Sequence, residues 1–138
     1  MRRFDTVLFD LDGTLLDTLA DLRQGLNYAL STQGFAPRTL PEVRAFVGNG
    51  IRKLIERAVP AGTDEAQIEA VFEAFNPYYA VHCADYTRPY PGIPELLRQL
   101  EPYNVRLLHA HCPIVSTMVA RELRQVLDVP LVLTYHTK

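Results

Sequence analysis

The stretch Val7-Leu8-Phe9-Asp10-Leu11-Asp12-Gly13-Thr14 decides the fold of this chain. Residues 6–9 form a continuously apolar run rich in β-forming residues, which is typical of a strand buried on both faces of a parallel sheet. The run ends abruptly at two carboxylates and a glycine. Because ligands of open α/β sheets bind at the carboxyl ends of the strands, we expect a ligand site at residues 10–14.

The residues that follow, up to about Tyr86, have the pattern of a small helical bundle. Leucines recur at spacings of three and four ahead of Gly34, which supplies the stop of an amphipathic helix. Thr39 and Glu42 predict a capping box at the start of a second helix, and Asn49 is a candidate N-cap of a third.

A fourth helical pattern begins at the N-cap candidate Thr63, and we expect Pro77 to kink or interrupt it. Beyond Pro91-Gly92 the pattern changes. Further elements are predicted there, in the order helix, strand, helix and strand: residues 93–100, 105–109, 116–127 and 129–133. Strands separated by helices imply right-handed crossovers and a parallel α/β sheet.

The composition excludes several classes of function. The 138 residues contain 14 Lys and Arg against 16 Asp and Glu, with the basic residues scattered among acids, which argues against a nucleic-acid partner. No apolar run approaches the roughly 20 residues that span a bilayer, and the first residues make a poor signal peptide. We therefore expect a cytoplasmic protein with no membrane partner. Cys83 and Cys112 lack metal-ligand spacing and are expected to be reduced thiols.

Asp10 and Asp12 are the candidate catalytic pair. They lie two residues apart, so a continuing strand would place both side chains on one face. Two close carboxylates repel each other unless a cation holds them, and Mg²⁺ prefers oxygen ligands. Asp10 can attack phosphorus to form an aspartyl-phosphate, while Asp12 protonates the leaving oxygen and later deprotonates water. Gly13 permits a tight turn beside the ligand, and Thr14 adds a hydroxyl.

A metal-free turn is the alternative for the same residues. Asp-x-Asp by itself equally fits a solvated Asp-Gly turn that caps the following helix. An EF-hand loop is rejected, because its glycine belongs at loop position six and Gly13 is fourth.

The longer string Val7-Leu8-Phe9-Asp10-Leu11-Asp12-Gly13-Thr14-Leu15-Leu16-Asp17 resembles the first motif of the haloacid dehalogenase (HAD) superfamily of phosphotransferases. The similarity covers about residues 1–100. It includes three further strings that look like the phosphoglycolate phosphatase branch: residues 21–34, Val47-Gly48-Asn49-Gly50 with Arg52, and Tyr90-Pro91-Gly92-Ile93 with Leu96 and Leu97.

The resemblance implies an α/β fold in which a helical cap is inserted after the first strand. Residues 17–86 would form the α-helical cap. Residues 1–16 and 87–138 would form a discontinuous and incomplete core, a truncated Rossmann-like parallel sheet of about three strands. An exposed edge of that sheet would permit self-association.

The resemblance also implies roles for single residues. Asp10 would be the nucleophile and Asp12 the acid/base, and Asp10 with the main-chain carbonyl of Asp12 would bind Mg²⁺. Gly13 and Thr14 would lie beside the phosphate. Substrate-facing residues would come from the cap: Gly48, Asn49, Gly50 and Arg52. Arg52 is equally compatible with a surface arginine on a capped helix.

Three parts of the family pattern are not matched within these residues. His111 stands where the second strand should end in a phosphate-binding hydroxyl, Lys138 is the only late lysine, and no acidic pair follows residue 129. We expect hydrolysis of a small phosphorylated metabolite, a phosphoglycolate-like monoester, with impaired turnover. The alternative is a non-catalytic, truncated or recombined fragment.

Residues 102–138 resemble the amino-terminal part of family 4 GT-B glycosyltransferases. The likeness rests on His109-Ala110-His111-Cys112-Pro113-Ile114-Val115-Ser116 and on Val129-Pro130-Leu131-Val132-Leu133-Thr134-Tyr135-His136-Thr137-Lys138. A glycosyltransferase-related function is therefore a third hypothesis. A metal site formed by His109, His111 and His136 is geometrically possible, and structural histidines are the alternative.

Overall fold

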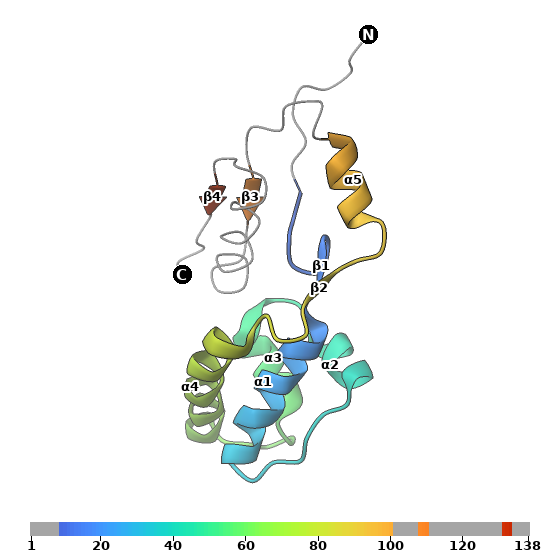
Figure 1. Ribbon diagram of the computed structural model, residues 1–138. Coiled ribbons are helices and arrows are strands. Elements are labelled where there is room, and N and C mark those ends of the chain that lie inside the picture. The colour runs from blue at the N-terminus through green and yellow to red at the C-terminus, as the bar shows by residue number, and fades with distance from the viewer. Residues whose placement is uncertain (1–8, 101–107, 111–130, 134–138) are drawn as a thin grey trace. The chain divides into compact units, whose positions relative to one another are not determined.

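Two compact units make up the chain, one of them Thr18–Thr87 and the other formed by Met1–Asp17 with Arg88–Lys138. The computed structural model describes residues 9–100, 108–110 and 131–133 (Figure 1). In the described part of the chain, no helix combines the length and the apolar character that a membrane crossing requires.

The unit Thr18–Thr87, hereafter the helical unit, contains four helices. They are α1 (Leu19–Thr32), α2 (Leu40–Phe46), α3 (Gly50–Ala58) and α4 (Glu65–His82). Helix α1 packs against α2 and α4, and α3 packs against the same two helices. The largest fully buried apolar side chains come from all four: Leu26, Leu30, Val43, Leu54, Ile55, Val71 and Phe75.

Helices α1 and α4 approach each other closely at Gly25. A Cβ atom at this position would lie 3.1 Å from Cε2 of Phe75 and 3.2 Å from Cδ2 of Tyr79. The two aromatic rings stack on each other with centroids 4.9 Å apart. Glycine therefore lets the α1 backbone lie directly on this aromatic pair.

The predicted stop at Gly34 is confirmed. Gly34 has φ of 71°, its N–H donates to the carbonyl of Ser31 at 3.1 Å, and the Phe35 N–H donates to the carbonyl of Leu30 at 3.0 Å. This is the Schellman arrangement, in which a left-handed residue lets the chain satisfy the last helical carbonyls.

The capping box at the start of α2 is confirmed too. The Thr39 N–H donates to Oε2 of Glu42 at 2.8 Å. The hydroxyl of Thr39 lies 2.6 Å from the same oxygen. These bonds lower the pKa of Glu42, first through the Thr39 side chain and then through its backbone.

One expectation about α4 is wrong, and of the two effects expected of Pro77 an interruption is absent. Asp64, not Thr63, is its N-cap, and the Asp64 carboxylate accepts a hydrogen bond from the Gln67 N–H at 2.8 Å. Thr63 instead donates its hydroxyl to the carbonyl of Pro60 at 2.7 Å. Pro77 does not interrupt α4, which runs from Glu65 to His82. Pro77 is exposed, so the backbone carbonyl left without an N–H partner one turn earlier lies where water reaches it.

The other unit contains two short strand pairings and one helix. Strand β1 (Leu16–Asp17) pairs antiparallel with β2 (Arg88–Pro89), a pairing that the sequence reasoning did not anticipate. Helix α5 (Ile93–Leu100) follows, at the predicted residues.

Strand β3 (Leu108–Ala110) pairs in parallel with β4 (Leu131–Leu133), with Leu108 opposite Leu131 and Ala110 opposite Leu133. The parallel relation of these two segments is therefore confirmed. Residues 6–8 and the predicted helix at 116–127 lie outside the described residues, and Phe9 is not in a strand. The sheet of about three strands and its Rossmann-like character accordingly stay predictions.

Candidate functional site

Asp10 and Asp12 lie on a tight turn that a buried residue anchors. Leu11, between them, is buried, whereas Asp10 is exposed and Asp12 is half-buried. The carbonyl of Leu11 accepts hydrogen bonds from the N–H groups of Leu15 at 3.0 Å and Leu16 at 2.9 Å. Anchored by Leu11, the turn leaves the Asp10 carboxylate facing solvent.

Gly13 and Thr14 form the exposed tip of this turn. Gly13 has φ of 74°, which a residue with a Cβ rarely adopts, and its N–H donates to the carbonyl of Leu16 at 2.9 Å. Beneath the tip lies a small apolar cluster: Leu11, Leu15, Leu16, Phe9 and Ile93. The predicted need for glycine at a tight turn is thus met.

The segment after β2 supports the turn from a distant part of the sequence. The Tyr90 N–H donates to the carbonyl of Leu15 at 3.0 Å, and β2 pairs with β1 directly beside this bond. The Ile93 N–H donates to the carbonyl of Tyr90 at 3.1 Å, which fixes the start of α5. The Asp10 turn is therefore braced by residues about 75 positions further along the chain.

The Asp10 carboxylate has one held oxygen and one available oxygen. The Leu11 N–H donates to Oδ1 of Asp10 at 2.8 Å. Within residues 9–100, no hydrogen bond or ion pair engages Oδ2. This arrangement fixes the carboxylate direction while leaving an oxygen that can act as a nucleophile or as a metal ligand.

The donor chemistry of this turn suits Mg²⁺. Mg²⁺ usually keeps several waters and binds through one or two carboxylates, so a pair such as Asp10 and Asp12 meets its requirements. Among the described residues, no group of three or more His, Cys, Asp or Glu side chains lies close enough to hold a metal. A cage made of side chains alone is therefore not a feature of the described part.

The second group of candidate residues lies in the helical unit, in the loop Val47–Gly50 between α2 and α3. Three successive residues have positive φ: Gly48 at 121°, Asn49 at 65° and Gly50 at 86°. All of them are exposed. Asp10, Asp12, Gly13 and Thr14 thus come together in one unit, and Gly48, Asn49, Gly50 and Arg52 in the other.

Asn49 occupies the N-cap position of α3 as expected, but its side chain makes no cap hydrogen bond. Instead Oδ1 of Asn49 accepts a hydrogen bond from Nη2 of Arg57 at 3.1 Å. The left-handed backbone of Asn49 turns the side chain to this use, because a capping side chain normally requires an extended N-cap residue. Sequence reasoning missed Arg57, whose partners lie up to 11 positions away.

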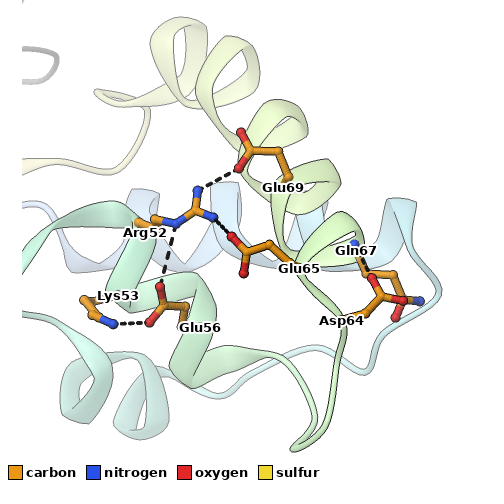
Figure 2. A network of polar contacts seen from close by, with 7 residues as sticks. All are labelled: Arg52, Lys53, Glu56, Asp64, Glu65, Gln67 and Glu69. Atoms are coloured by element: carbon orange, nitrogen blue, oxygen red, sulfur yellow. Dashed lines mark hydrogen bonds and ion pairs between the residues drawn. The ribbon is translucent and has the colours of Figure 1, made fainter.

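Arg52 lies at the centre of an exposed ionic network between α3 and α4 (Figure 2). Its guanidinium contacts Oε2 of Glu69 at 2.7 Å, Oε1 of Glu56 at 3.7 Å, and the carboxylate of Glu65. The hydrogen bond to Glu69 is the largest of the causes that raise the pKa of Arg52. Three carboxylates already neutralise Arg52, so a substrate anion must compete with them, and its substrate contact stays a prediction.

The remaining candidates are histidines of the C-terminal third. His109 belongs to β3 and lies opposite Val132 of β4. His111 and His136 lie outside the described residues, so neither the phosphate-binding role of His111 nor the histidine metal site is tested.

Comparison with known proteins identifies the family. The family model for haloacid dehalogenase-like hydrolases matches residues 7–129. A phosphoglycolate phosphatase of Agrobacterium fabrum is 40% identical over 103 residues, covering 72% of this chain and 44% of the relative. An N-acetylmuramic acid 6-phosphate phosphatase of Pseudomonas aeruginosa is 38% identical over 99 residues, covering 72% and 44%. The chain spans less than half the length of these curated relatives.

Solved structures agree at the level of the fold. A crystal structure described as a predicted phosphoglycolate phosphatase of Haemophilus somnus 129PT superposes with a TM-score of 0.77 at 24% identity. The match covers 96% of this chain and 64% of that chain. A haloacid dehalogenase-like protein of Streptococcus pneumoniae gives 0.70 at 19% identity, with 94% and 60% covered. Both support an α/β fold of the haloacid dehalogenase type.

The resemblance of the C-terminal segment to a glycosyltransferase is not shown by these comparisons. The family match continues to residue 129, across most of the segment 102–138 that resembles a glycosyltransferase. The glycosyltransferase resemblance is not supported by this match. From the first strand motif through most of that segment, the chain belongs to the haloacid dehalogenase-like hydrolase family.

Proposed function

We propose that this chain hydrolyses a small phosphomonoester, with Asp10 as the nucleophile and Asp12 as the general acid and base. One observation carries the proposal. Asp10 stands exposed on a braced turn, with Oδ1 held by the Leu11 N–H and Oδ2 without a partner in the described part of the chain. A carboxylate that is oriented and yet accessible meets the requirements of an attacking group.

The reaction consists of two displacements at phosphorus. In the first, Oδ2 of Asp10 forms a bond to phosphorus while the bond to the ester oxygen breaks, and Asp12 donates a proton to the leaving alcohol. In the second, Asp12 takes a proton from water as the water oxygen bonds to phosphorus. The bond between phosphorus and Asp10 then breaks and releases inorganic phosphate.

Asp10 and the main-chain carbonyl of Asp12 would hold Mg²⁺, with the Asp12 carboxylate beside it. When bound, the ion neutralises charge on the phosphoryl oxygens. The exposed Gly13 and Thr14 lie beside these carboxylates in sequence, where the Thr14 hydroxyl can donate to phosphate and Gly13 leaves room for it.

The substrate class follows from the relatives and from the cap loop. The names of the curated relatives are phosphoglycolate phosphatase and N-acetylmuramic acid 6-phosphate phosphatase, so both are phosphatases of small phosphate esters. We assign the helical unit as the cap and the loop Val47–Gly50 as its substrate-contacting part. A phosphoglycolate-like monoester is the proposed substrate, and we expect slow turnover by these 138 residues, since His111 replaces the expected hydroxyl.

The test is hydrolysis of phosphoglycolate and of para-nitrophenyl phosphate with and without Mg²⁺. We expect Mg²⁺-dependent release of phosphate that Asp10→Asn lowers by at least about 10²-fold. Glu73→Gln is the matched control, because Glu73 is exposed on α4 and its side chain makes no hydrogen bond or ion pair with described residues. Activity that survives Asp10→Asn would refute the mechanism. An unaltered chain without any hydrolysis would favour the non-catalytic alternative.

A further inference from the structure

We propose that Arg57 is a positioning residue that holds the loop Val47–Gly50 in its substrate-contacting shape and thereby tunes which phosphate esters are accepted. The inference rests on the proposed function for the role of the loop. Its structural part rests on contacts of Arg57 alone.

Arg57 gathers three oxygen atoms that lie before and within the loop. Its Nη1 donates to the carbonyl of Phe46 at 2.7 Å and to the carbonyl of Gly48 at 3.1 Å. Its Nη2 donates to Oδ1 of Asn49 at 3.1 Å. The planar guanidinium suits this task because it presents several N–H donors in a fixed fork.

The position of Arg57 joins two helices as well. Phe46 is the last residue of α2, and Arg57 lies in the last turn of α3. A cation beside the carbonyls at a helix C-terminus is favourable, because the final carbonyls lack N–H partners within the helix. One side chain therefore ties the end of α2 to the loop that opens α3.

The loop has little else to hold it. Val47 is 49% exposed. A Cβ atom placed on Gly48 or on Gly50 would meet nothing within 4 Å, so no neighbouring atoms pack against these two positions. Glycines tolerate positive φ, but Asn49 between them carries a Cβ atom and has φ of 65°, a conformation that costs a non-glycine residue free energy. The Arg57 hydrogen bonds supply the restraint that packing does not.

Arg44 provides a matched control. It is an exposed arginine on the neighbouring helix α2, and its side chain makes no hydrogen bond or ion pair with the described residues. Arg44→Gln therefore changes the net charge as Arg57→Gln does, without releasing the loop.

The first measurement is amide hydrogen exchange of the full chain. We expect Arg57→Gln to speed exchange of residues 47–51 by about tenfold, because three charge-assisted hydrogen bonds are lost. The exchange rate in Arg57→Lys should lie between those of wild type and Arg57→Gln, since an ammonium is a point charge that lacks the several fixed N–H donors of a guanidinium. Arg44→Gln should leave the loop unchanged. Equal exchange in Arg57→Gln and wild type, or an equal effect of Arg44→Gln, would overturn the proposal.

The second measurement separates KM from kcat for phosphoglycolate and for para-nitrophenyl phosphate. We expect Arg57→Gln to raise KM for phosphoglycolate by about tenfold with kcat changed little, because the loop binds substrate and does not reach the chemistry. A fall in kcat with unchanged KM would overturn the specificity role. A chain without any hydrolysis would overturn that role together with the proposed function, whereas loop exchange would still decide whether Arg57 holds the loop.

Discussion

Two polar sites in the helical unit each join segments distant in sequence, and the two sites differ in how deeply they are buried. Asp21 joins the first turn of α1 to the chain that follows α4, and it is 1% exposed. Arg52 joins α3 to α4, and its side chain is 40% exposed. Asp21 and its partner Thr87 are buried, whereas the Arg52 network is in contact with water.

The Asp21 carboxylate is fully engaged. Its Oδ1 accepts a hydrogen bond from the Tyr86 N–H at 2.9 Å. Its Oδ2 accepts from the Thr87 N–H and from the Thr87 hydroxyl, both at 2.7 Å. Thr18 and Thr87 are the first and last residues of the helical unit, so Asp21 links the beginning of this unit to its end. Hydrogen bonds to a buried carboxylate are strong, and a buried donor that loses its acceptor is costly.

The Arg52 network contains more charged groups than the Asp21 site, yet we expect it to contribute less to the stability of the unit. Its partner Glu65 has a side chain that is 77% exposed, and Glu69 is 46% exposed. Exposed ion pairs gain little, since water screens the charges and ordering long side chains costs entropy. We therefore expect burial, rather than the number of ion pairs, to decide how much a polar contact stabilises this unit.

The largest effect should come from Asp21. We expect Asp21→Ala to lower the free energy of unfolding by about 3 kcal/mol, because two backbone N–H groups and a hydroxyl lose their acceptor. Urea unfolding at pH 7 measures it. Thr87→Val should lower the free energy of unfolding by less than Asp21→Ala does. Thr87→Ser should lower it by less than Thr87→Val, since serine keeps the hydroxyl. A decrease below about 1 kcal/mol for Asp21→Ala would contradict the expectation that the buried site stabilises the unit more than the exposed network does.

Arg52→Gln should have a clearly smaller effect. We expect a small decrease in the urea midpoint at low salt that disappears in about 1 M NaCl, where the Debye length is only about 3 Å. Arg44→Gln serves as the control for the loss of one positive charge. A decrease equal to that of Asp21→Ala, or one that salt does not change, would show that solvent exposure does not determine how much these contacts stabilise the unit.

The smallest effect should be the pH dependence of Glu56. The hydrogen bond from Lys53, with the charges of Lys53, Arg52 and Arg57, lowers the pKa of Glu56 below its ordinary value of 4.5. Folding therefore favours the ionised carboxylate, so this contribution is present above about pH 4.5 and is lost as the pH falls through the lower folded-state pKa. We expect the stability difference between wild type and Lys53→Gln to shrink in that acidic range. A difference that grows on acidification would contradict this sign.

Several features predicted from local signals are confirmed. Gly34 ends α1 and the pair Thr39 and Glu42 opens α2, because each signal acts within a few residues. The N-cap of α4 was misplaced by one residue, since both Thr63 and Asp64 are good caps and only the backbone decides which one is extended. The helix continues through Pro77, and the exposed position of this proline on α4 is a tertiary property that the sequence does not indicate.

In the candidate site, too, the sequence indicates the local features and only the structure shows the long-range contacts. Asp10 and Asp12 were recognisable from the string that surrounds them, and the tight turn at Gly13 is where a glycine was needed. The bracing of that turn by Tyr90 was not recognisable, and neither was the use of Asn49 and Arg57 as partners. These contacts join residues that no local spacing relates.

The sequence by itself determined the family, the carboxylate pair and the positions of most helices, because motifs, caps and apolar periodicity are short-range properties of the chain. Only the tertiary structure decided which polar residues become buried and which oxygen atoms each cation meets. Asp21 and Asp64 are both aspartates at the start of a helix, yet one closes the helical unit and the other caps α4 in the open. The physical reason is burial: the same carboxylate stabilises far more where the fold removes water from its hydrogen bonds.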